Sequence, residues 1–257
     1  MTPELVKAIA GAQLYDLAQE WRVGMPHWPS HPPFLYGLRQ SHGDVQLPGG
    51  GSSASEILTL GGHVGTHIDA LCHFSCDGRL HGGAEAAAVQ SVEHGFQALG
   101  IQTVGPIVRR GVLFDVAGEN GELPPDRAIT AADLQRAARA ELRAGDVALI
   151  RTGWARYWDQ PRRMANSQAP GPNLEAASWL SSHGIFAAGS DTLAFEAVPA
   201  PSMPVHVHLL VEKGIHIIEA LNLEQLAADQ VHEFLFIASP LKISGGTGSP
   251  IRPFALV

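Results

Sequence analysis

The chain has 257 residues, of which 45% are hydrophobic and 16% are charged, and its formal net charge is -8 at pH 7. This length and apolar fraction suit a single domain with a substantial core over residues 1–257. Because the chain is acidic and has no run of Lys or Arg, we expect neither a nucleic-acid partner nor binding to an anionic membrane surface. No apolar stretch reaches the about 18 residues of a membrane span. The N-terminal segment does not read as a secretory signal, so we expect a soluble, cytoplasmic protein.

Helix and strand patterns alternate along the chain, as in α/β proteins. Short β-branched or apolar runs predict strands at 56–60 and 107–115, and residues 84–99 are expected to form a helix or a helix plus a loop. Thr130 opens a helix to about Ala144 with an N-capping pattern. A buried strand follows at 146–152.

The second half of the chain continues the same alternation. Asn173 caps a predicted helix over 174–183, and predicted strands follow at 185–188, 215–221 and 233–239. Clusters of Pro and Gly predict pocket-forming loops at 24–51, 118–125 and 161–172.

One segment, residues 61–74, concentrates three histidines and an aspartate among small residues. Side chains alternate along an extended chain, so His63, Gly65, His67 and Asp69 would share one face. A helix would bring His63 and His67 together but turn Asp69 away. Gly65, lacking a side chain, would let a ligand approach the backbone. The pattern predicts a metal site with room for a substrate.

A second group of candidate ligands lies in residues 204–221. If residues 215–221 form a strand, Glu219 shares a face with Ile215, Ile217 and Leu221 and is an isolated carboxylate among apolar side chains. A buried carboxylate needs a partner, and a cation is one; an Arg pair or a turn cap is the structural alternative. A nitrogen ligand could come from His206 or His208, whereas His216 should point the other way.

The two cysteines, Cys72 and Cys76, are too few for a disulfide scaffold or a thiolate-rich zinc module. A metal must therefore use nitrogen and oxygen ligands, and Zn²⁺ and Mn²⁺ both suit that set. A redox pair of the two cysteines is less favoured than a small apolar role. A Cys72 nucleophile assisted by His73 is disfavoured, because adjacent residues on an extended chain face opposite ways.

The segment His63-Val-Gly-Thr-His67-Ile-Asp69-Ala-Leu-Cys-His73-Phe74 resembles the signature of the cyclase superfamily of metal-dependent hydrolases, which includes kynurenine formamidase, isatin hydrolase and trans-dienelactone hydrolase. The resemblance extends over essentially the whole chain. It includes a Trp-Pro loop at 25–29, a central strand at 145–154, a Gly-x-Asp-Thr turn at 189–192 and the C-terminal segment 240–250.

The resemblance implies a swivelling β/β/α fold with a mixed central sheet flanked by helices. It implies metal ligands at His63, His67 and Asp69 and a catalytic proton-transfer histidine at His73. It further implies that Glu219 completes or bridges a two-metal site. The remaining implied ligand is His206, with His208 as the fallback, and a single-metal site is the alternative. Similar enzymes are commonly dimers or tetramers in which a neighbouring chain helps to line the pocket.

The expected reaction is attack of metal-bound hydroxide on an amide carbonyl, followed by protonation of the leaving nitrogen by His73. The substrate would be a small aromatic or cyclic amide. Trp28 would form an aromatic wall for it, and Asp191 and Thr192 would hold hydrogen bonds behind the ligands. A lactone hydrolase and a noncatalytic metal-dependent binding protein are the alternative functions.

Two departures from the formamidase pattern bear on the substrate. Leu71 follows the Asp-Ala pair where formamidases usually have Pro, and the chain has extra material near 38–54 and 154–172. These insertions are expected to remodel the pocket, which weakens the case for formylkynurenine more than the case for hydrolysis.

Overall fold

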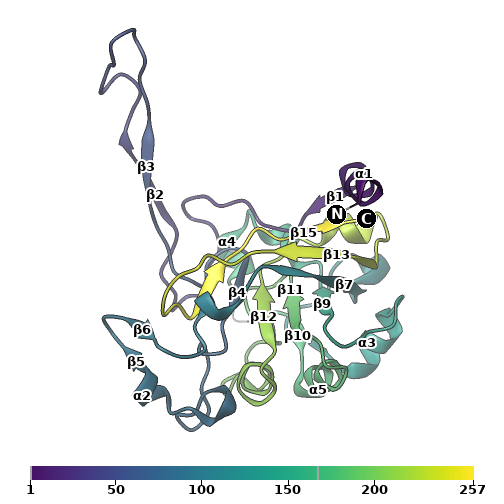
Figure 1. Cartoon of the computed structure of the whole chain (residues 1–257). Coiled ribbons are helices and arrows are strands. Elements are labelled where there is room, and N and C mark those ends of the chain that lie inside the picture. Colours follow the sequence, from purple (N-terminus) through teal and green to yellow (C-terminus); the bar gives the residue numbers. More distant parts are fainter. Residues whose placement is uncertain (1, 167) are drawn as a thin grey trace.

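A nine-stranded mixed sheet forms the centre of the computed structural model, which describes residues 2–166 and 168–257 (Figure 1). Ser167, inside the loop expected at 161–172, lies outside the described residues. The strands, in order across the sheet, are β1 (Leu14–Asp16), β15 (Phe254–Leu256), β13 (Glu233–Ala238), β7 (Ile107–Asp115), β9 (Val147–Arg151), β11 (Ala187–Ser190), β12 (His216–Glu219), β4 (His67–Asp69) and β14 (Gly248–Pro250). The four central strands from β7 to β12 are parallel, and the pairs outside them are antiparallel.

Helices and three small sheets surround the central sheet. The helices are α1 (Pro3–Gly11), α2 (Ala86–Val89), α3 (Ala131–Ala137), α4 (Pro161–Met164), α5 (Leu174–Ser182), α6 (Pro204–His206) and α7 (Glu224–Ala228), with 3₁₀ turns η1 (His81–Gly83), η2 (Ile101–Thr103), η3 (Gly118–Asn120) and η4 (Trp154–Tyr157) and the π-helical η5 (Val207–Lys213). The strand pairs are β2 (Leu35–Gln40) with β3 (Ser55–Thr59), β5 (Gln90–Ser91) with β6 (Gly95–Phe96), and β8 (Ala128–Ile129) with β10 (Gly171–Pro172). This is the expected mixed sheet flanked by helices.

Alternation along the buried strands divides the core between the two faces of the sheet. On β9, Val147 and Leu149 join a cluster that includes Leu226 of α7, whereas Ala148 and Ile150 join a cluster that includes Leu180 of α5. Both faces are therefore covered, which explains why the central strands read as continuous apolar runs.

All six predicted strands form within two residues of their expected ends, but two predicted helices are much shorter. The helix expected from Thr130 to Ala144 has the expected capping box, yet it ends at Ala137, and Ala138 is extended. Leu142 then packs into the same apolar cluster as Leu134. Tertiary packing thus overrides the helix propensity of this Ala-rich segment. The segment 84–99 has only the four-residue α2, followed by the β5–β6 hairpin.

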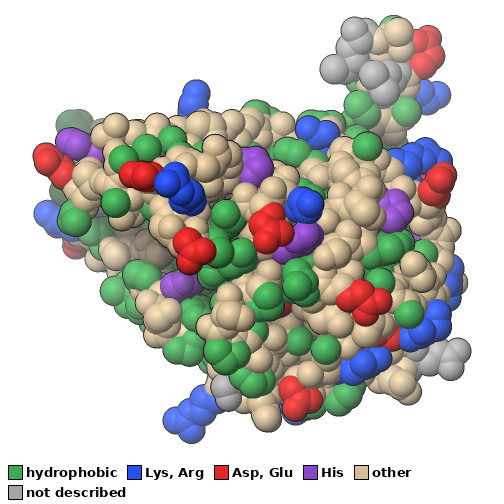
Figure 2. All heavy atoms as spheres, turned by 90° about the horizontal axis from the view of Figure 1, so that it is seen from below, with side chains coloured by type: hydrophobic (Ala, Val, Ile, Leu, Met, Phe, Trp, Pro, Cys, Tyr) green, Lys and Arg blue, Asp and Glu red, His purple; other side chains and the backbone are tan. Residues whose placement is uncertain are grey.

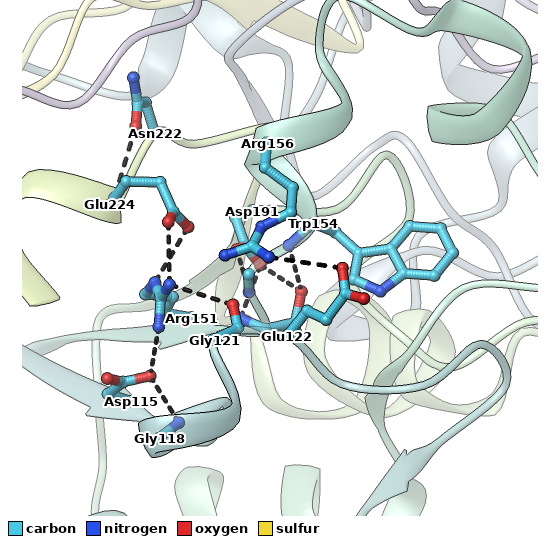
Figure 3. Close-up of polar contacts among 12 residues, drawn as sticks. Asp115, Gly118, Gly121, Glu122, Arg151, Trp154, Arg156, Asp191, Asn222 and Glu224 are labelled. Carbon is cyan, nitrogen blue, oxygen red and sulfur yellow. Dashed lines mark hydrogen bonds and ion pairs between the residues drawn. The ribbon is translucent and has the colours of Figure 1, made fainter.

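The carboxyl ends of the parallel strands are held together by polar contacts of two buried side chains, Arg151 and Asp191 (Figure 3). Arg151, at the end of β9, donates to Asp115 at 2.9 Å and to both carboxylate oxygens of Glu224 at 2.9 and 2.8 Å. Asp191, just after β11, accepts hydrogen bonds from Thr152 and Gly153 at 2.6–2.9 Å. These contacts join β7, β9, β11 and α7 at the carboxyl ends of the parallel strands.

A β-hairpin arm, residues 35–59, extends away from the rest of the molecule (Figure 1). Residues 41–54, which belong to the segment 38–54 expected to be extra material, form the tip of this arm. No helix in the described parts of the chain is long and apolar enough to cross a membrane. On the face shown in Figure 2, acidic and basic side chains are scattered among apolar and neutral ones.

Candidate functional site

The three motif residues His63, His67 and Asp69 meet beside the short strand β4. Ile68 points into one core cluster, so His67 and Asp69 point to the other face, as the alternation predicts. His63 lies in the turn before the strand, and its Nδ1 donates to Asp69 Oδ1 at 2.7 Å. All three side chains are nearly inaccessible to solvent.

The backbone of this motif departs from the extended geometry that we expected over 63–69. Only residues 67–69 are strand, and Gly65 has a positive φ of 63°. A Cβ at Gly65 would lie 2.4 Å from Nε1 of Trp21, so the missing side chain accommodates an indole and not a ligand. The expectation for Gly65 was therefore wrong, because the left-handed turn directs that position toward Trp21.

Glu219 comes to the motif through the pairing of two strands. In the antiparallel register of β12 and β4, Glu219 is opposite His67, and its Oε2 lies 3.3 Å from Nε2 of His67. Ile215 and Ile217 face the same core cluster as expected, but Leu221 faces the other one, because Ala220 has a φ of 54° and ends the alternation.

His206 completes the group from α6. Its Nε2 lies 3.2 Å from Oε1 of Glu219, which also accepts a hydrogen bond from the backbone N–H of Phe195 at 2.7 Å. His208 does not belong to the group; its ring contacts Ser181 of α5 and Glu212 of η5. His216 also lies outside it and contacts the carbonyl of Asp69 through Nδ1 at 2.8 Å.

These five side chains form two overlapping sets of potential metal ligands that share Asp69. One set is His63, His67 and Asp69, and the other is Asp69, His206 and Glu219; within each set the ligand atoms lie within 4.8 Å of one another. His67 Nδ1 donates to the Gly65 carbonyl at 2.8 Å, so Nε2, which faces Glu219, is the nitrogen available to a metal ion. Within the described residues, neither His67 Nε2 nor Asp69 Oδ2 has a hydrogen-bond partner, although both are buried. Buried unpaired polar atoms are costly, and a divalent cation would satisfy both. The residues therefore fit a metal ion.

The acidic groups of the site are held as anions. Burial alone would raise the pKa of Glu219, but the adjacent imidazoles of His206 and His67 lower it to about 2. Burial likewise opposes ionisation of Asp69, and the neighbouring His73, His63 and His67 outweigh it, so the pKa of Asp69 falls far below its usual value. Ionised carboxylates and imidazole nitrogens are the donors that Zn²⁺ and Mn²⁺ accept.

His73 lies beside both sets without belonging to either. Its ring stacks on that of His63 with a centroid distance of 3.8 Å, and the adjacent Phe74 packs against His206 at 5.0 Å. Burial lowers the pKa of His73 to about 4, so its imidazole is neutral at pH 7 and can accept a proton. This is well below the ordinary value of about 6.5 for a histidine side chain.

A cavity of about 220 Å³ is lined in part by His73, His206 and Glu219, whereas His63, His67 and Asp69 do not line it. Its lining consists of Trp28, Ser30, His31, His73, Phe74, Leu193, Ala194, Met203, His206 and Glu219. The lining thus combines apolar and aromatic side chains with imidazoles and a carboxylate. A larger hollow of about 680 Å³, between residues 16–21 and 250–252, contains none of the expected site residues.

Other predicted site features lie elsewhere. The Asp191 carboxylate accepts from Thr152 and Gly153, and the Thr192 hydroxyl donates to the Ala194 carbonyl. Neither side chain bonds to a candidate ligand, so the expectation that they support the ligands was wrong. None of residues 38–54, the first segment expected to be extra material, lines the cavity, so the expectation that it remodels the pocket was wrong for this cavity. Within 154–172, by contrast, Trp154, Tyr157 and Trp158 form an apolar cluster against which Trp28 packs.

Cys72 is unsuited to nucleophilic attack. Its side chain is buried, and burial raises the pKa of the thiol to about 11, so almost none is thiolate at neutral pH. Both cysteines are free thiols, and Cys76 is exposed. These observations leave the small apolar role for Cys72.

Two site residues were missed by reasoning from the sequence. Glu196 is buried and bonds to His206; the only sequence signal is its position as the single charge in the apolar run 193–198. His31 lines the cavity with its ring 5.3 Å from that of His63. Its position in a Pro-rich loop gave no signal beyond its proximity to Trp28.

Comparison with known proteins places the chain among characterised hydrolases. The family model described as "Putative cyclase" matches residues 15–197. Isatin hydrolase of Roseibium aggregatum is 31% identical over 213 residues, covering 78% of this chain and 73% of the relative. Kynurenine formamidase of Geobacillus thermodenitrificans is 25% identical over 243 residues, covering 92% and 94%.

Solved structures show the same fold. The structure of a novel cyclase superimposes with a TM-score of 0.90 at 29% identity and covers 100% of this chain and 92% of its own. An isatin hydrolase bound to the product analogue thioisatinate superimposes with a TM-score of 0.77 at 25% identity, covering 100% and 99%.

Proposed function

The chain belongs to the cyclase family and is an amidohydrolase, and from this premise we propose that it cleaves the amide C–N bond of a small aromatic or cyclic substrate with the help of a bound divalent metal ion. The observation that carries the proposal is the pair of ligand sets sharing Asp69, which contain two buried atoms with no hydrogen-bond partner among the described residues. A noncatalytic binding protein would not need His73, a neutral base stacked at the edge of these sets.

We propose Zn²⁺ or Mn²⁺ as the metal, with one or two ions per chain. His63, His67 and Asp69 would hold the first ion, and His206 and Glu219 would join Asp69 at the second. A bound divalent ion supplies a coordinated water with a pKa lowered toward about 7 and polarises a carbonyl oxygen.

The other steps belong to side chains of this protein. One ring nitrogen of neutral His73 accepts a proton from the attacking water, and the same nitrogen later donates this proton to the leaving nitrogen of the substrate. The stacked ring of His63 limits the movement of His73, so the base is already in place before the substrate arrives. Trp28, Phe74, Leu193 and Met203, the apolar part of the lining, exclude water from the cavity.

The cavity limits the substrate class. A volume of about 220 Å³ is below the about 300–1,000 Å³ of pockets for drug-sized ligands, so the substrate must be compact. Trp28 and Phe74 present flat apolar surfaces that suit an aromatic ring. Relatives named isatin hydrolase and kynurenine formamidase act on aromatic amides, which agrees with this lining.

Hydrolysis with and without metal tests the proposal. The chain, stripped with a chelator and then reloaded with Zn²⁺ or Mn²⁺, is assayed with isatin and with an N-formyl arylamine. We expect hydrolysis of at least one probe to disappear on stripping and to return on reloading. If the chain binds neither ion, or if hydrolysis continues undiminished in the stripped protein, the proposed function is wrong.

We also propose that the chain forms a homodimer or homotetramer through the arm. Leu35, Tyr36, Leu38, Ile57 and Leu58 of the arm are each half or more exposed. An isolated two-stranded hairpin is marginally stable in water, so the arm needs a packing partner. The arm begins after Phe34 and ends before Leu60, three residues before His63 in the sequence.

Removal of the arm should dissociate the oligomer. Replacing residues 37–57 by a two-residue turn is expected to lower the mass found by sedimentation equilibrium to that of a monomer, while the intact chain sediments as a dimer or tetramer. An unchanged mass would rule out the arm as the contact.

A further inference from the structure

Glu196 is a buried carboxylate that the proposed reaction does not use. Only 2% of it is exposed, and it lies behind His206, on the side away from Glu219. Its carboxylate accepts three hydrogen bonds: from the His206 ring Nδ1 at 2.7 Å, from the His206 backbone N–H at 2.9 Å, and from the Val205 N–H at 3.3 Å. The carboxylate therefore contacts both the backbone and the ring of one candidate ligand.

This contact determines which ring nitrogen of His206 faces the site. With Nδ1–H donating to Glu196, Nε2 is directed at Oε1 of Glu219, 3.2 Å away. Phe74 packs on the ring at 5.0 Å and limits its rotation. Partners that hold the second nitrogen of a histidine ligand fix its tautomer and orientation.

The position of Glu196 is itself fixed by close backbone packing. Gly171, in β10, lies against residues 195–197, where a Cβ would come within 2.4 Å of the Glu196 carbonyl carbon. The N–H of Ala197 donates to the carbonyl of Pro172 at 3.4 Å. This segment therefore cannot shift without disturbing β10, so Glu196 is a rigid support.

The structure shows no hydrogen bond or ion pair between Glu196 and the other described candidate ligands. His63 bonds to Asp69 and Thr247, and His67 Nδ1 bonds to the Gly65 carbonyl, so these contacts of the first ligand set do not involve Glu196. Loss of the Glu196 carboxylate should therefore affect the two metal positions unequally.

We propose that Glu196 is the positioning residue of the second metal position: it holds His206 with Nε2 toward Glu219, and occupancy there depends on it although it is not itself a ligand. This inference rests on the proposed function, since it concerns the second of the two ions.

A metal titration of Glu196→Gln tests this role. The metal-free full chain is titrated with Zn²⁺ against a chromophoric chelator, and the cobalt-loaded form is followed by its visible absorption. We expect the first equivalent to bind as in the unmodified chain and the second to bind about 10–100-fold more weakly. Glu212→Gln is the matched control, because Glu212 accepts from Nδ1 of His208 at the same 2.7 Å but outside the site, and both equivalents should be unchanged.

The outcomes separate this inference from the proposed function. A Glu196→Gln protein that binds both equivalents normally, or loses both equally, would overturn the positioning role. An unmodified chain that binds one ion only would also overturn it while leaving a one-metal hydrolase, whereas a chain that binds none would overturn the proposed function. If the Gln variant does not fold, Glu196→Asp, which keeps the charge but withdraws the carboxylate, should weaken the second equivalent selectively, and failure to do so would overturn the role.

Discussion

Replacing Asp69 by Asn is expected to abolish tight metal uptake and to lower kcat/KM for amide hydrolysis by more than about 10³-fold, since loss of even one electrostatic stabiliser costs about 10²–10³ in kcat. Asp69 is the member that the two ligand sets share, so one substitution removes an anionic donor from both. The side chain keeps its size, and Oδ1 can still accept from His63. Metal content measured by inductively coupled plasma mass spectrometry, together with hydrolysis rates, checks the prediction.

A second buried aspartate provides the control. Asp146 is also nearly inaccessible, and it accepts from Arg110 at 3.2 Å and from the Arg143 N–H at 2.8 Å, away from the site. Asp146→Asn should lower the midpoint of thermal unfolding without selective loss of metal. If Asp69→Asn retained the metal, or if the two variants lost it equally, the shared-ligand assignment would be wrong.

The motif in residues 61–74 predicted more of the site than any other part of the chain. The period-two spacing of His67 and Asp69 placed both on one face of β4, because strand geometry is local and can be read from sequence. The meeting with Glu219 is not local. It depends on the register of β12 against β4, which sequence spacing does not contain.

The errors arose where long-range packing decides the conformation. Gly65 adopts its positive φ beside Trp21, a residue 44 positions earlier in the chain, which no local pattern anticipates. The choice between His206 and His208 likewise depended on which helix face turns toward the sheet. Glu196 gave only a weak signal, because a lone acid in an apolar run is buried only if the fold supplies donors for it.

The second large effect concerns proton transfer. His73→Ala is expected to lower kcat by about 10²–10⁴-fold, the usual contribution of a general acid–base group, while metal content stays unchanged. The reason is geometric: His73 borders the cavity and stacks on His63 but belongs to neither ligand set. Parallel measurement of kcat and metal content separates this role from that of a ligand.

Added imidazole should restore part of the activity of His73→Ala, since it can enter the space that the ring leaves and act as the missing base. His208→Ala is the control, because His208 bonds to Ser181 and Glu212 outside the cavity, and its kcat should not change.

The pKa of His73, lowered to about 4 by burial, gives the sign of the pH dependence. The neutral base persists as the pH falls from 7 to 5, so protonation of His73 should not lower kcat in that range. A His73→Ala protein that turned over at the normal rate would exclude His73 as the proton-transfer residue and direct attention to His31, the other described histidine that lines the cavity outside both ligand sets.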